Sequence, residues 1–120
     1  MKIMFRFTLL VLLLSAAGAA QSAVSAADAK NHLGEQATVC GEVASTHYAA
    51  RSKGQPTFIN LDRPYPNQVF TVLIWGSDRP TFGNPDHTYM GKRICVTGSI
   101  REYRGVPEII AFDPSQIKVQ

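Results

Sequence analysis

Several features that decide function in other proteins are scarce or absent in this chain of 120 residues. It has two cysteines, three histidines and one tryptophan. Its apolar run, Phe7 to Leu14, is too short to cross a hydrocarbon core, which requires about 20 residues. It has no internal repeat, linker or low-complexity segment. These absences argue against a membrane anchor and a repeat protein, and they favour one small domain.

The polar residues lack the grouping that metal binding or catalysis requires. The histidines at 32, 47 and 87 show none of the close Cys/His spacing of zinc sites. Carboxylates are spread singly, and no serine or cysteine has a nearby histidine and acid to activate it. Asp78, Asp86 and His87 share one loop and could bind a metal, but such residues more often cap turns. We therefore expect a protein that is not an enzyme and that uses no metal or cofactor.

The first 20 residues are built like a secretory signal peptide. Lys2 and Arg6 precede the apolar run, and a stretch of small residues follows it. No cysteine near the possible cleavage sites could accept a lipid. We therefore expect export to the periplasm or the medium, without stable membrane insertion, as a soluble monomer.

Two positions for signal cleavage can be distinguished by the helix that begins beside one of them. Cleavage could follow Ala19 or Ala26, each of which ends a small-residue motif. Ser25 to Asp28 resembles the capping box of a short helix ending at Leu33, before Gly34. Cleavage after Ala26 would remove this cap, which favours cleavage near Ala19 or Ala20 and a domain over 25–120. Removal of 1–20 leaves 10 basic and 9 acidic residues, a net charge of +1.

The remaining chain alternates β-rich segments with turn residues. Between the third and fourth segments, 76–91 is dense in Gly, Pro, Asn and Asp, which predicts irregular backbone, with Phe82 and Tyr89 plugging the core. Ile117 to Val119 is expected to pair with an earlier strand, and Asp113 to hold backbone donors of a turn. Phe70, Val72, Ile74, Ile59 and Leu61 are predicted in the core, and Phe58, Asn60, Thr71 and Trp75 on the opposite face. The predicted strands are 37–48, 56–62, 68–75, 93–102 and 106–112.

Two blocks of this sequence resemble a family of small exported bacterial OB-fold domains. They are SKGQPTFINLDRPYPNQVFTVLIWG and YMGKRICVTGSIREYRGVPEIIAFDPSQI. The resemblance implies an all-β fold, a five-stranded OB-fold Greek-key barrel with a short N-terminal helix. It also implies an association with nucleic acid, and it transfers no catalytic residue.

The cysteine pair is expected to form a disulfide. An oxidising compartment favours a bond between Cys40 and Cys95. In the OB barrel that the resemblance implies, their strands are antiparallel neighbours, and both side chains would point away from the core. The alternative is two unpaired cysteines that pack as small apolar residues.

Candidate ligand-binding residues cluster near two loops and the sheet face between them. Single-stranded nucleic acid needs cations for phosphates and aromatic faces on which bases stack. The alternative is that these aromatics are cross-strand packing partners and the cations a solvated rim, since a net charge of +1 is low for a dedicated nucleic-acid binder. The candidates are Tyr48, Arg51, Lys53, Phe58, Asn60, Trp75, Arg101, Tyr103 and Arg104.

Two functional hypotheses follow from these residues. The first is a non-enzymatic periplasmic or secreted module that binds single-stranded DNA or RNA, or another polyanion. The second is an envelope adaptor that presents the same face to a protein partner, with an oligosaccharide as a further ligand class.

Overall fold

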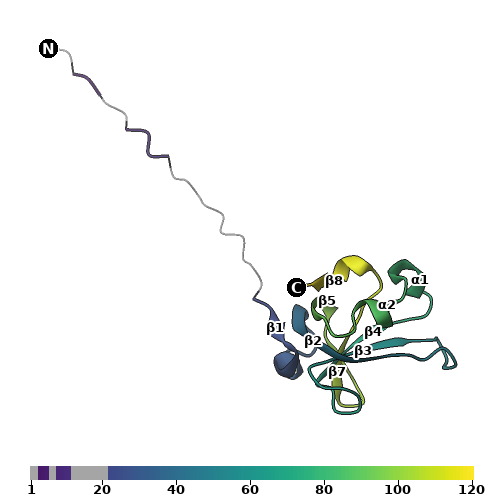
Figure 1. Cartoon of the computed structure of the whole chain (residues 1–120). Coiled ribbons are helices and arrows are strands. Elements are labelled where there is room, and N and C mark those ends of the chain that lie inside the picture. Colours follow the sequence, from purple (N-terminus) through teal and green to yellow (C-terminus); the bar gives the residue numbers. More distant parts are fainter. Residues whose placement is uncertain (1–2, 6–7, 12–21) are drawn as a thin grey trace.

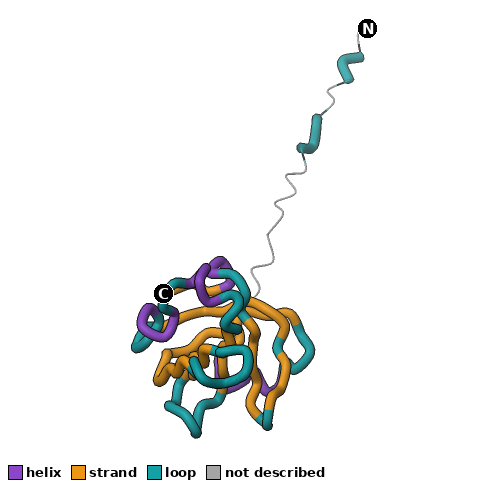
Figure 2. The backbone as a smooth tube through the Cα atoms, turned by 90° about the vertical axis from the view of Figure 1, so that its right-hand side faces the viewer, coloured by secondary structure: helices purple, strands orange, loops and turns teal. Residues whose placement is uncertain are grey.

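The computed structural model describes residues 3–5, 8–11 and 22–120. Most of the predicted signal peptide lies outside the described residues, and so does the preferred cleavage region at Ala19 and Ala20. From residue 22 onward the chain forms a strongly curved, mixed sheet with short helical segments at its margins (Figures 1 and 2). No helix in the described part has the length and apolar character needed to span a membrane.

Eight strands make up the sheet, which contains both parallel and antiparallel pairs. The hydrogen-bonded path runs β6-β7-β4-β3-β2-β5-β8, and β1 pairs in parallel with β2. The β4–β7 pair is also parallel, whereas the other pairs are antiparallel. The strands are β1 (Val24–Ser25), β2 (Gln36–Tyr48), β3 (Thr57–Leu61), β4 (Phe70–Ile74), β5 (Arg93–Ser99), β6 (Arg101–Tyr103), β7 (Val106–Ile110) and β8 (Ile117–Val119).

The prediction of five strands in a closed barrel is wrong in its count and its closure. The predicted strand 93–102 is divided at Ile100, whose N–H donates to the carbonyl of Glu35 and whose carbonyl accepts from the N–H of Gly34. Because the backbone of Ile100 pairs with this turn, the sheet ladder is interrupted between β5 and β6. The pairing path is open and ends at the short strand β8, and a second short strand, β1, pairs with β2 off this path. Of these two additions only the pairing of 117–119 was predicted. The fold resembles an OB-like domain in its β-rich core.

The predicted core is confirmed. Strand alternation turns Ile59, Leu61, Phe70, Val72 and Ile74 to one side, and each has no exposed surface. A fully buried side chain of this size contributes about 1.5 to 3 kcal/mol relative to an exposed one. These residues pack with Ile94, Val96, Ile109 and Ala111, so both halves of the sequence share a single core.

The N-terminal helix exists in a shorter form than predicted. It is a 3₁₀ helix, η1 (Ala26–Asn31), and the Ser25 hydroxyl accepts the Asp28 N–H at 3.2 Å. The predicted cap is therefore confirmed, and the helix ends before the predicted Leu33. Ala26 and Ala29 are buried against the core, which anchors this segment.

The segment between β4 and β5 has two single helical turns, α1 (Arg79–Phe82) and α2 (Pro85–Thr88). Tyr89 is buried in the core and Phe82 is packed against it, as predicted. A second 3₁₀ turn, η2 (Pro114–Gln116), precedes β8, and Asp113 accepts the Ser115 N–H at 2.9 Å. The predicted turn-holding role of Asp113 is confirmed.

The Cys40–Cys95 disulfide is present and joins β2 to β5. The two residues are direct register partners, with Cα atoms 4.0 Å apart. Their side chains lie outside the core cluster, on the predicted face, but they are buried rather than exposed to solvent. The bond closes a loop with a sequence separation of 55 residues, which gives about 4 kcal/mol of stabilisation by loop-closure entropy.

Candidate functional site

A row of polar side chains crosses the face of the sheet opposite the core, which we call the outer face. Strand register places Ser45 beside Asn60, Asn60 beside Thr71, Thr71 beside Glu108, and Glu108 beside Arg101. Five strands therefore contribute one residue each to a continuous line. The row is the centre of the candidate site, because the predicted binding residues of β3 and β6 lie on it or next to it.

The β2 to β4 half of this row is internally satisfied. The Thr71 hydroxyl donates to the Asn60 side-chain oxygen at 3.1 Å, and the Asn60 amide donates to the Ser45 hydroxyl at 3.0 Å. Asn60 and Thr71 lie on the predicted face, but they are only 3% and 5% exposed and so are buried there rather than open to solvent. The Ser45 hydroxyl also accepts the Tyr65 N–H at 3.0 Å, which ties the β3–β4 loop to this row. Asn60 thus supports the face rather than offering free hydrogen-bonding groups.

The β7 to β6 half is not satisfied in the same way. Glu108 is 3% exposed, and its Oε1 lies 3.0 Å from the Nε of Arg101 without the alignment of a hydrogen bond. Burial raises the pKa of Glu108 above its ordinary value of 4.5, and the charge of Arg101 opposes this rise. The Arg101 side chain is half exposed. It combines a fixed position with accessible guanidinium surface.

One loop beside this face is the β2–β3 connection, residues 49–56. Gly54 has φ +77° and lies under Trp75, so close that an added Cβ would lie 2.9 Å from the indole ring. The Gly76 N–H donates to the Gly54 carbonyl at 2.9 Å. Trp75 is 37% exposed, and Arg51 and Lys53 in the same loop are exposed. The loop that carries the predicted cations therefore packs against an aromatic ring.

The other loop is the tight turn between β6 and β7. Tyr103 pairs with Val106, and Arg104 and Gly105 both have positive φ, which fits a two-residue hairpin turn of the primed type. The Arg104 guanidinium lies 5.3 Å from the centre of the Tyr103 ring. Both side chains are exposed. This turn also combines a cation with an aromatic face, as the sequence predicted.

The two loops lie at opposite ends of the outer face. Thr57, which follows the first loop, pairs with Ile74 at the end of β4. The hairpin turn precedes β7, whose Glu108 pairs with Thr71 near the start of β4. A strand of five residues spans about 17 Å. The predicted residues therefore form two clusters at the ends of a face, with the polar row of Asn60, Glu108 and Arg101 between them.

Tyr48 and Phe58 are placed on different sides of the sheet. Phe58 pairs with His47 and Leu73 on the outer face and is half-buried. Tyr48 pairs with Thr57, on the side covered by α1 and α2, where the Arg79 guanidinium lies 3.6 Å from its ring centre. The structure thus separates Tyr48 from the other predicted residues, because adjacent positions of a strand face opposite ways.

Arg79 forms a closed polar cluster on this covered side. It donates to the Thr57 hydroxyl at 2.9 Å, to Asp86 at 3.0 Å and to Asn84 at 3.3 Å. Its side chain is 14% exposed, and the ring of Tyr48 covers it. Asp86, which shares a loop with Asp78 and His87, therefore serves as the partner of Arg79.

Phe112 is a surface aromatic that the sequence interpretation did not select. It follows Ile110 by two residues, just as Trp75 follows Leu73, and Leu73 and Ile110 are register partners on parallel strands. The two aromatics therefore leave the sheet at the same end. Phe112 is 64% exposed. Its sequence signal, an aromatic before Asp-Pro at the end of a strand, was interpreted as part of the strand.

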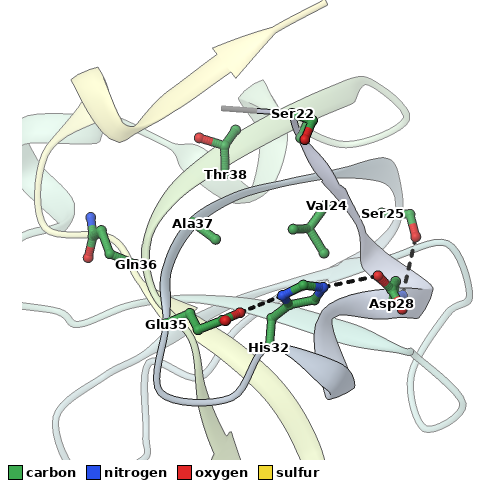
Figure 3. Close-up of a pocket in the computed structure, with 10 residues that line it drawn as sticks. Ser22, Val24, Ser25, Asp28, His32, Glu35, Gln36, Ala37 and Thr38 are labelled. Atoms are coloured by element: carbon green, nitrogen blue, oxygen red, sulfur yellow. Dashed lines mark hydrogen bonds and ion pairs between the residues drawn. The ribbon is translucent and has the colours of Figure 1, made fainter. Parts of the chain in front are cut away.

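A separate hollow lies beside η1, with a volume of about 780 Å³. Figure 3 shows His32 between Asp28 and Glu35, hydrogen-bonded to both. A hydrogen bond to Glu35 and a weaker effect from the hydrogen bond to Asp28 raise the pKa of His32 above 6.5. The pKa of Asp28 is lowered, mainly by its hydrogen bond to Asn31 and then by the one to His32. Because both ring nitrogens of His32 are engaged, the cluster offers no free base. Within the described ranges, no group of three or more His, Cys, Asp or Glu residues could hold a metal ion.

Comparisons with known proteins support the fold and leave the ligand open. No family model matches this sequence, and no curated protein matches it. A solved structure described as an aspartyl-tRNA synthetase from Leishmania major Friedlin is similar, with a TM-score of 0.54 and 11% sequence identity. The similarity covers 89% of this chain and 22% of that one. At this identity the likeness concerns the fold alone.

Proposed function

We propose that this chain is an exported, non-enzymatic binding module for single-stranded nucleic acid or a related polyanion. One observation carries the proposal: exposed cations accompany an exposed aromatic ring at each end of one sheet face. Arg51 and Lys53 lie in the loop that packs against Trp75, and Arg104 lies next to Tyr103. A nucleic-acid strand that runs from one loop to the other would meet phosphate-binding and base-stacking groups in turn.

The charges of these cations support an electrostatic role. None of Arg51, Lys53 and Arg104 lies within 4 Å of a carboxylate among residues 22–120 and the described residues before them. By contrast, Arg79 and Arg101 each have such a partner. A polyanion carries condensed cations along its phosphates, and unpaired arginines and lysines that neutralise those phosphates release them, which drives binding at low salt.

Fluorescence anisotropy with labelled oligothymidylate and oligouridylate tests the proposal. Oxidised protein should bind both saturably at low salt and more weakly at physiological salt. The double variant Lys53→Ala/Arg104→Ala should bind about tenfold more weakly, and the slope of log affinity against log salt should fall by roughly 1.4.

The matched control is Lys30→Ala/Lys118→Ala, which removes the same charge outside the two loops, from η1 and β8. Equal loss in both double variants would show a nonspecific charge effect. Absence of binding at low salt would overturn the proposed function.

A protein partner is the second candidate ligand, and the position of β8 at the edge of the sheet favours it. This strand lies at one end of the pairing path, so within the described residues one edge of its backbone pairs with no other strand and could accept an added one. An adaptor would capture one envelope protein in a pull-down that salt does not weaken. If the outer face mediates that capture, Phe58→Ala or Trp75→Ala would abolish it.

A further inference from the structure

A second hollow, of about 430 Å³, lies where β5, β6 and β7 approach one another. This volume is within the range of sites that bind small organic groups. Gly98 permits the approach, since a Cβ there would lie 2.6 Å from the Ile109 side chain. The walls that matter for recognition are formed by Gln36, Ser99, Arg101, Ile110, Phe112 and Gln116.

The aromatic wall of this groove has a fixed backbone. The Gln116 side-chain oxygen accepts the N–H groups of Phe112 and Asp113 at 2.8 and 3.0 Å. The Gln116 amide nitrogen donates to the carbonyls of Thr97 and Ile110 at 3.1 and 3.3 Å. One side chain thus ties the backbone beneath Phe112 to both neighbouring strands. An exposed aromatic ring on a held backbone loses little entropy when a ligand stacks on it.

The charge of the groove is one-sided. No carboxylate lines it, and Arg101 is its one charged residue among those the structure describes. Glu108 holds the Nε of Arg101 from the adjacent strand, and the guanidinium makes no second ion pair with any described carboxylate. Its remaining N–H groups are therefore free to meet acceptor oxygens. Tyr103 lies two residues further along β6, on the same face of the strand as Arg101.

A ligand that fits these walls is flat, apolar on its faces, polar at its edge and rich in acceptor oxygens. A nucleobase with its phosphate has all four properties: the ring stacks on Phe112, its edge reaches Gln36 and Ser99, and an oxygen accepts from Arg101. We propose that this groove binds one base of the single-stranded nucleic acid, an inference that rests on the proposed function.

The test compares two labelled ligands of equal length, oligothymidylate and the same backbone without bases. The wild-type protein should bind oligothymidylate about tenfold or more tightly than the abasic strand, because a stacked base contributes roughly five- to 150-fold. Phe112→Ala should lose about tenfold affinity for oligothymidylate and little for the abasic strand. Tyr65→Ala is the matched control, because Tyr65 is 73% exposed and does not line the groove.

Each other outcome has a distinct meaning. If Phe112→Ala binds oligothymidylate as the wild type does, the groove is not used, although the proposed function stands. If the abasic strand binds equally well, base recognition is overturned. If a neutral maltooligosaccharide binds and is lost in Phe112→Ala while oligothymidylate does not bind, the groove belongs to sugars. If no polyanion binds, the proposed function itself falls.

Discussion

Two arginines on opposite sides of this sheet have similar neighbours and different remaining capacity. Each of Arg79 and Arg101 has a guanidinium nitrogen 3.0 Å from a carboxylate oxygen. Arg79 lies over the ring of Tyr48, and Arg101 is two residues from Tyr103 on β6. Arg79 donates hydrogen bonds to Thr57, Asp86 and Asn84, and its side chain is 14% exposed. Arg101 has one imperfect partner and is 50% exposed.

This contrast separates a structural arginine from a candidate ligand-binding one. Breaking a satisfied, largely buried cluster leaves polar groups without partners and costs stability. Removing the half-exposed Arg101 costs the interactions it would make with a ligand, and it also leaves the buried carboxylate of Glu108 without its cation. The type of residue and the distance to a carboxylate are alike, so the number of satisfied donors is the informative quantity.

The largest expected effect follows from breaking the satisfied cluster. Arg79→Ala should lower the free energy of unfolding by about 2 to 3 kcal/mol, because Asp86 and Thr57 lose their donor. Urea denaturation measures this change. Affinity of the folded variant for oligothymidylate should match that of the wild type. A loss of affinity without a loss of stability would reverse the roles assigned to the two arginines.

The next effect concerns the partly satisfied arginine. Arg101→Ala should weaken binding of oligothymidylate about tenfold and reduce the salt slope by roughly 0.7, as expected for one phosphate contact. Arg93→Ala on β5 removes the same charge and provides the control. Since Arg101 and Phe112 line one groove, their combined substitution should be less than additive in binding free energy. Full additivity would argue that they act at separate sites.

Glu108→Gln tests whether the buried carboxylate beside Arg101 destabilises the fold when it is ionised. Burial raises the pKa of Glu108 above 4.5, so its contribution to stability is greatest below that pH and is lost as pH rises through the folded-state pKa. The neutral glutamine removes this dependence. The variant should therefore gain stability relative to the wild type as pH rises from about 4 to about 7. If the wild type gains instead, the pair with Arg101 is net stabilising.

The smallest effect is expected at His32, outside both arginine clusters. Hydrogen bonds to Glu35 and Asp28 raise the pKa of His32 above 6.5. Its contribution is therefore present below pH 6.5 and is lost as pH rises through the raised value. The stability difference between wild type and His32→Gln should shrink between about pH 5.5 and about pH 8.5. A constant difference would mean that protonation is not coupled to folding.

The sequence predicted what depends on local pattern. Alternation of apolar residues placed Ile59, Leu61, Phe70 and Val72 in the core, and the tight turn at Arg104 and Gly105 falls in the gap between the predicted strands 93–102 and 106–112. The pairing of Cys40 with Cys95 followed from the strand order of the fold that the sequence resembles. These features involve nearest neighbours in the chain or a known topology.

Features that depend on distant contacts were missed. Ile100 interrupts a strand because the turn at Gly34 and Glu35 takes its backbone groups. Asn60 is buried through partners on two neighbouring strands, and Phe112 is fixed by an amide four residues ahead that also reaches β5. No spacing rule reports such contacts, because they arise after the sheet has formed.

Backbone amide NMR during titration with oligothymidylate is the most direct test of the central claim that the outer face is the binding surface. The account predicts shifts that cluster in 51–55, at Trp75, in 99–104 and in 110–112, with the region around Arg79 unaffected. Shifts confined to 76–89 would contradict the account, because they would place the ligand on the satisfied arginine.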